Sequence, residues 1–178
     1  MPRLLSHILS ACLLALAATA PSKAAPPSAT DLQALRNFEL TPSFLERYYA
    51  YEDLAVEKPC ELSPLLVLQD DGRMSLDDTV RKFESRPGVE KALAESGLTG
   101  RELLLGTMTL MGAAMQELAA QHPDIVKQHP DATRLAISDA NMAFYKAHQD
   151  ELHRHMAERA QKAMAKRGGK LPPCMRGQ

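Results

Sequence analysis

The sequence contains no tryptophan and few aromatic residues, with only four tyrosines and four phenylalanines. Leucine, alanine and nine methionines supply most of its apolar side chains. Unbranched apolar residues favour helices, whereas strands are enriched in aromatic and β-branched residues. The composition therefore predicts an all-α protein.

The chain also lacks an excess of either charge. It carries 21 basic and 22 acidic residues, for a formal net charge of -1. Loss of an N-terminal segment containing Arg3 and Lys23 leaves the remainder mildly acidic. Binding to nucleic acid or to an anionic membrane surface through the whole molecule requires a basic balance. We therefore expect no nucleic-acid partner.

Familiar catalytic and cofactor motifs are missing as well. The sequence has no Gly-x-Ser-x-Gly, His-Glu-x-x-His, P-loop or dinucleotide fingerprint. It has neither the Cys-x-x-Cys-His of covalently bound haem nor the paired Glu-x-x-His of di-iron bundles. No cofactor is predicted. Catalytic residues scattered along the sequence would leave no such motif, so an enzyme of unknown class stays open as a third alternative.

The N-terminal segment resembles a secretory signal. Residues 1–3 are a short basic stretch, and residues 8–20 form an apolar stretch of about the length that such signals have. Ser22 and Ala24 supply small residues for cleavage between Ala24 and Ala25. We therefore predict a signal peptide over residues 1–24 and a periplasmic or secreted location.

Residues 9–12 also resemble the recognition sequence for lipid attachment, which would anchor the protein through Cys12. In a lipoprotein signal the apolar region precedes the cysteine. Here most of the apolar stretch follows Cys12. The pattern therefore favours the signal peptide over a lipid anchor.

Cysteine is scarce, and only Cys60 and Cys174 remain after signal removal. In an oxidising compartment a single pair predicts a disulfide, here between the C-terminal tail and a loop early in the chain. Closing a loop of this length stabilises a fold by roughly 4–5 kcal/mol in the chain-entropy model. Free thiols in a redox or metal role are the alternative, but no Cys-x-x-Cys motif supports it.

A small-residue spacer over residues 25–29 precedes one predicted helical domain over residues 30–178. Caps and apolar periodicity predict a bundle of about five to seven helices. Thr30, Thr41, Ser75 and Ser138 are the expected N-caps. The expected helices cover about 31–40, 42–56, from 64 onward, 75–85, 87–96, 99–121 and 139–167, with a connector of two single turns over 123–135.

The stretch from Thr99 to Gln121 is expected to be the buried central helix. Thr99 and Glu102 form a capping box at its start. Residues 103–115 are almost entirely apolar, but thirteen residues rise about 20 Å, against a hydrocarbon core of about 30 Å. We therefore predict a core helix and no transmembrane span after signal removal.

The last helix has an apolar stripe and a basic run. The residues expected to face inward are Met142, Tyr145, His148, Leu152, Met156, Ala160 and Ala163. The basic residues are Arg154, Arg159, Lys162, Lys166, Arg167 and Lys170. This run suits either a solvated face with cations near the helix C-terminus or a contact with anionic lipid or a partner.

Histidines on the same helix raise the question of a metal. His148 and His155 lie about 10.5 Å apart along the helix axis, and His153 is on another side. Glu151 is spaced to share an ion with either His148 or His155. Two ligands do not make a site. The sequence thus predicts no complete metal site, and His148, Glu151 and His155 are candidate ligands for copper or zinc.

Two segments carry a resemblance to other proteins. Residues 86–105 (RPGVEKALAESGLTGRELLL) and 141–152 (NMAFYKAHQDEL) resemble an uncharacterised family of small exported bacterial proteins. The resemblance implies a helical protein secreted by a Gram-negative bacterium. It implies no activity and no catalytic residue.

Small residues and methionines recur along the central and last helices, a pattern that can leave an adaptable apolar groove. We therefore expect a non-enzymatic exported protein that binds a partner protein or a small apolar ligand. The alternative is a periplasmic stress protein that binds copper or zinc. A tightly filled core without an apolar pocket or patch would contradict the ligand hypothesis.

Overall fold

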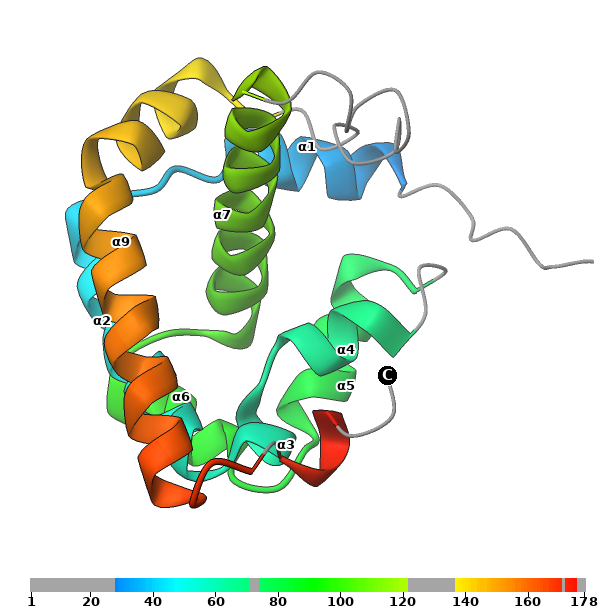
Figure 1. Cartoon of the computed structure of the whole chain (residues 1–178). Helices are drawn as coiled ribbons and strands as arrows, with labels where there is room; N and C mark the ends of the chain where they lie inside the picture. The colour runs from blue at the N-terminus through cyan, green and yellow to red at the C-terminus, as the bar shows by residue number, and fades with distance from the viewer. Residues whose placement is uncertain (1–27, 71–73, 122–136, 171, 176–178) are drawn as a thin grey trace, which may run out of the picture.

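The computed structural model describes residues 28–70, 74–121, 137–170 and 172–175. Over this part the chain forms eight α-helices and one 3-10 helix, with no strand (Figure 1). The elements are α1 (Ala29–Asn37), α2 (Pro42–Glu57), α3 (Pro59–Leu62), α4 (Leu65–Asp70), α5 (Leu76–Glu84), α6 (Val89–Ser96), α7 (Gly100–Gln121), α9 (Asp139–Lys166) and η2 (Pro173–Met175). The prediction of an all-α, single-domain fold is confirmed.

The predictions for the N-terminus lie outside the described residues. They are the signal peptide over residues 1–24, its cleavage between Ala24 and Ala25, and the alternative lipid anchor at Cys12. The connector over residues 123–135 and most of the spacer also lie there. These expectations stay predictions.

Three of the four expected N-caps are confirmed. The side chains of Thr41, Ser75 and Ser138 each accept a hydrogen bond from a backbone N–H in the first helical turn. The cap of α1 was predicted at Thr30, but it is Ser28, whose Oγ accepts from the Asp31 N–H at 3.0 Å. Thr30 lies inside the helix instead.

The sequence also predicted a break where the structure has α3. Helix α2 ends at Glu57, and Pro59 begins a new helix. Proline is tolerated in the first turn because its missing N–H costs nothing there. The N–H groups of Glu61 and Leu62 then bond to the Lys58 carbonyl. This single turn brings the helices of the described part to eight rather than five to seven.

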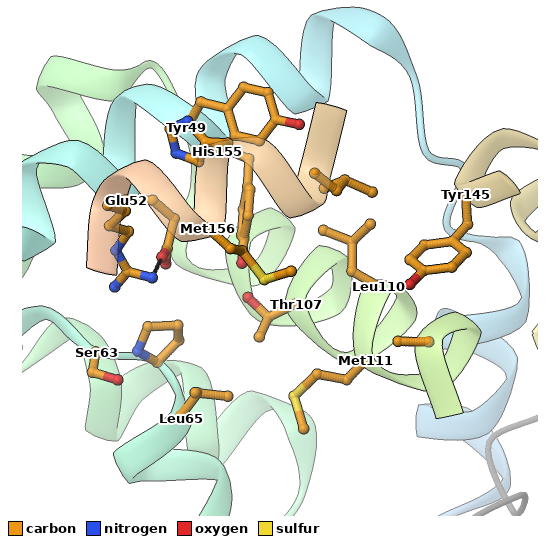
Figure 2. Close-up of a pocket in the computed structure, with 15 residues that line it drawn as sticks. Tyr49, Glu52, Ser63, Leu65, Thr107, Leu110, Met111, Tyr145, His155 and Met156 are labelled. Carbon is orange, nitrogen blue, oxygen red and sulfur yellow. Dashed lines mark ion pairs between the residues drawn. The ribbon is translucent and has the colours of Figure 1, made fainter. Parts of the chain in front are cut away.

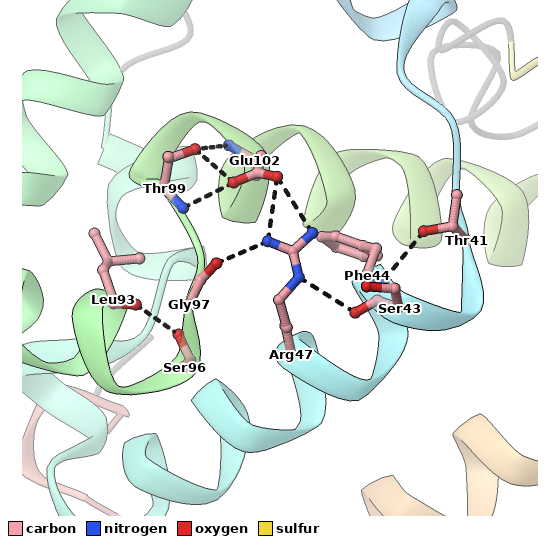
Figure 3. Close-up of polar contacts among 9 residues, drawn as sticks. All are labelled: Thr41, Ser43, Phe44, Arg47, Leu93, Ser96, Gly97, Thr99 and Glu102. Carbon is pink, nitrogen blue, oxygen red and sulfur yellow. Dashed lines mark hydrogen bonds and ion pairs between the residues drawn. The ribbon is translucent and has the colours of Figure 1, made fainter.

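The start of α7 is a capping box, as predicted (Figure 3). The Thr99 N–H donates to Glu102 Oε2 at 2.9 Å, and the Glu102 N–H donates to Thr99 Oγ1 at 3.1 Å. Arg47 of α2 joins the same corner. It donates to the Gly97 carbonyl at 2.7 Å and to Glu102 at 3.3 Å, which holds α2 against the turn that leads into α7.

Most of α7 between Gly100 and Ala113 is buried. The helix packs against α1, α5 and α9, and at Gly106 the ring of Phe44 from α2 occupies the place of a side chain. Among the described residues, α7 is the one helix long and apolar enough to cross a membrane by length and composition. Half of its most apolar window is buried within the fold, as in the core helix of a globular protein.

Helices α2 and α9 run side by side in the same direction, and α7 runs opposite to both (Figure 1). A ladder of ion pairs joins the parallel helices. Its rungs are Glu52–Arg159, Asp53–Lys162 and Glu57–Lys166. Half of the basic run of α9 is thus neutralised by the carboxylates of α2.

A disulfide links Cys60 of α3 to Cys174 of η2, as predicted. It ties the tail that follows α9 to the segment that follows α2. Arg86 strengthens the same region because its guanidinium donates to the carbonyls of Ser63 and Cys60. Helix α9 is therefore connected to the neighbours of α2 by a covalent bond.

Candidate functional site

A pocket of about 280 Å³ opens between α2, α7, α9 and the segment that enters α4 (Figure 2). Three of its apolar residues are well exposed. Leu65 is 38% exposed, Met111 48% and Met156 54%. They form an apolar rim at the mouth. The remaining apolar lining consists of Pro64, Leu110, Ala114, Tyr145 and Leu152.

A charged pair lies at one end of this pocket. Glu52 of α2 forms an ion pair with Arg159 of α9. The Glu52 side chain is 6% exposed, whereas that of Arg159 is 29% exposed. Burial raises the pKa of Glu52, although the neighbouring guanidinium opposes this shift. The guanidinium is therefore the accessible partner of the pair.

Tyr48 and Thr107 add two hydroxyl groups to the wall. Burial raises the pKa of Tyr48 above its usual range, and Glu52 raises it further. Thr107 Oγ1 donates to the Leu103 carbonyl at 2.8 Å. The Thr107 hydroxyl is thus engaged within the protein.

The rings of Tyr49 and His155 stack, with their centroids 4.0 Å apart. Burial lowers the pKa of His155. Its Nε2 is buried and meets no hydrogen-bond partner within the described part of the chain. Burial and the neighbouring Glu151 carboxylate raise the pKa of Tyr49 to about 12. Both rings are therefore uncharged at neutral pH, and the Tyr49 hydroxyl, like His155 Nε2, is buried without a hydrogen-bond partner among the described residues.

The structure brings together two of the three candidate metal ligands. His148 Nδ1 lies 3.0 Å from Glu151 Oε2, and the His148 ring stacks on Phe144. His155 is instead stacked on Tyr49. No group of three His, Cys, Asp or Glu side chains that could hold an ion occurs in the described ranges. Metal binding at this pair stays a prediction, and it needs further ligands.

The sequence did not point to Glu52 and Arg159. The predicted inward stripe of α9 continued from Leu152 to Met156 and Ala160, but both are exposed. The face that meets the fold runs instead through Leu152, His155 and Arg159. Residues 141, 145, 148, 152, 155 and 159 keep a spacing of three and four, but so does the predicted stripe, so the spacing alone did not distinguish the two faces.

No family model matches the chain, and neither a curated protein nor a solved structure matches it. The functional argument therefore rests on the geometry of the pocket.

Proposed function

We propose that this protein is an exported binding protein that holds a small apolar ligand in the pocket between α2, α7 and α9. The observation that carries the proposal is an apolar pocket of about 280 Å³ with an apolar rim. An apolar cavity of about 150 Å³ is enough to bind benzene. A pocket nearly twice that size suits a ligand with about a dozen carbon atoms.

Binding is better supported than catalysis. Six ionisable side chains line the pocket: Tyr48, Tyr49, Tyr145, Glu52, His155 and Arg159. A general acid or base must reach the substrate. Here Glu52 is buried against Arg159, and His155 is stacked on Tyr49 with its Nε2 buried. The candidate acid and the candidate base are thus both shielded, as in the wall of a binding site.

The test is binding of 1-naphthylamine, an uncharged and largely apolar dye that is small enough for the pocket and whose fluorescence shifts in apolar surroundings. We expect saturable binding by the wild-type protein. Ala114→Leu should weaken binding at least about tenfold, because the added atoms occupy the pocket and overpacking an apolar site is costly. Ala94→Leu is the matched control, since Ala94 is exposed on α6 and lies outside the pocket lining.

Thermal unfolding of both variants checks that each is folded. Dye binding that is absent in the wild-type protein, or equally strong in both variants, contradicts the proposal. Native mass spectrometry of protein purified from its own compartment then identifies the natural ligand.

A further inference from the structure

We propose that the ligand is a single-chain amphiphile with one carboxylate, whose head group binds the Arg159 guanidinium and whose chain lies along Leu110 and Met111. This inference rests on the proposed function, and it names the chemical class of the ligand. It is carried by the distribution of charge and exposure inside the pocket.

The pocket has a more polar end and a more apolar end (Figure 2). Glu52 and Ser63 lie toward one end, and Leu110, Met111 and Tyr145 lie toward the other. Among the described lining residues, Arg159 is the one side chain with a positive charge, because His155 is uncharged. A ligand with a polar group at one end and a hydrocarbon chain behind it matches this division.

The sign of the head group follows from the exposure of the ion pair. The Glu52 side chain is 6% exposed and the Arg159 side chain 29%. An incoming group therefore meets the guanidinium first. A cationic head would have to displace Arg159 from a buried carboxylate, which leaves a charge without its partner at a large cost.

The geometry of arginine favours a carboxylate over a neutral head group. A guanidinium has five N–H donors in a planar fork. The contact with Glu52 is made through Nη1, so other donors remain for a second acceptor. A carboxylate carries a full opposite charge and can accept two parallel N–H bonds from the fork, whereas an alcohol offers one uncharged oxygen. A carboxylate therefore gains more at Arg159 than an alcohol does.

Glu52 sets a limit on this gain because it places a negative charge near the bound head group. The other carboxylates that face this part of α9 are Asp53, which pairs with Lys162, and Glu158. Neutralising Glu52 removes the nearest repulsion and frees the guanidinium. The proposal therefore predicts that loss of the Glu52 charge strengthens binding of a carboxylate, whereas loss of the Arg159 charge weakens it.

The experiment compares decanoate, decanol and decyltrimethylammonium by titration calorimetry at fixed ionic strength. We expect the wild-type protein to bind decanoate about tenfold more tightly than decanol, and the ammonium compound more weakly than either. Glu52→Gln should strengthen decanoate binding several-fold without changing decanol binding. Asp53→Asn is the matched control, because Asp53 is on the same helix as Glu52 and pairs with Lys162 outside the pocket lining.

Removal of Arg159 alone leaves Glu52 buried without its partner, and that variant can fail to fold. The double variant Glu52→Gln with Arg159→Gln avoids the problem because both charges are removed together. It should bind decanol as the wild-type protein does and lose the preference for decanoate. A preference that persists in the double variant overturns the inference.

The outcomes separate the two proposals. If decanol binds and decanoate binds no more tightly, the pocket is a ligand site but its ligand is not a carboxylate. If none of the three compounds binds and the dye fails as well, the proposed function itself falls.

Discussion

Asn141 is a buried polar residue that holds two segments of the fold together. It is 2% exposed. Its Nδ2 donates to the Phe38 carbonyl at 2.7 Å, and its Oδ1 accepts from the Leu40 N–H at 2.8 Å. One amide thus bonds both the Phe38 carbonyl and the Leu40 N–H in the segment between α1 and α2. It fixes this segment to the first turn of α9.

Replacement of this amide should be costly. We expect Asn141→Leu to lower the free energy of unfolding by about 2–4 kcal/mol, because each buried backbone group left without a partner costs about 1–3 kcal/mol. Urea unfolding measures the change. Asn37→Leu is the control, since Asn37 is exposed and its side chain accepts a hydrogen bond from Gln33 on the surface of α1. Similar losses from both variants would contradict the role of Asn141.

His155 makes stability depend on pH in a predictable direction. Its pKa is lowered in the folded state by burial, so near and below pH 6.5 the unfolded chain binds more protons than the folded one. Stability is therefore complete above the unfolded pKa and falls as the pH drops below it. The burial of Glu52 acts in the opposite sense, because a raised carboxyl pKa favours the folded state at acidic pH.

His155→Phe keeps a ring against Tyr49 and removes the titrating group. We expect the melting temperature of this variant to fall less than that of the wild-type protein between about pH 7 and pH 5. His153→Phe controls for the loss of an exposed histidine on the same helix. Parallel pH profiles for wild-type protein and His155→Phe would show that His155 does not contribute.

At the scale of elements, the ring of Phe44 from α2 reaches α7 at one glycine, Gly106. A Cβ on Gly106 would overlap the ring of Phe44. We expect Gly106→Ala to destabilise the protein by about 1–3 kcal/mol through overpacking, although alanine is the better helix former by about 1 kcal/mol. Chemical denaturation measures this loss, and Phe44→Leu in the same chain should recover part of it.

Gly100→Ala provides the comparison. There the added Cβ meets the side chain of Glu84, which is exposed and can rotate away. We expect a smaller effect than at Gly106. If Gly100→Ala is the more damaging change, the contact between Phe44 and Gly106 is not what limits the approach of the two helices.

Local signals explain why most elements could be predicted from the sequence. Thr41, Ser75, Ser138 and the pair Thr99–Glu102 act on the N–H groups of their own helices, so no knowledge of the rest of the fold is needed. The helix break predicted before Pro59 is confirmed, since α2 ends at Glu57, but the short helix α3 was missed because proline can also begin a helix.

The candidate site was harder to predict because it depends on contacts between distant segments. The preference for apolar residues in the core placed Met156 on the inward face of α9. The carboxylate of Glu52, which is distant in sequence but adjacent in the fold, instead makes an inward Arg159 favourable. Similarly, the pocket exists only because α2, α7 and α9 meet at the entry to α4. No periodicity within one helix contains that information.

At the scale of the whole molecule, the disulfide closes a loop with a sequence separation of 114 residues. We expect Cys60→Ser with Cys174→Ser to lower the free energy of unfolding by up to roughly 4–5 kcal/mol, because the unfolded chain regains the freedom that the bond removes. Guanidinium unfolding with and without reductant measures the change.

The reduced wild-type protein and the double serine variant should unfold at the same denaturant concentration. Reductant should have no further effect on the variant. Unfolding of the variant at the concentration found for the oxidised protein would contradict a stabilising role for the bond.

The attachment of α9 at both ends also has a mechanical consequence. Asn141 fastens its first turn to the chain before α2, and the tail after it is fastened through Cys174 to Cys60. Because α9 is held at both ends, it can bend along its length but cannot move outward as a rigid body. For the proposed ligand we therefore expect entry and exit past Leu65 and Met111, on the side of the pocket mouth opposite α9, while α9 keeps its place in the pocket wall.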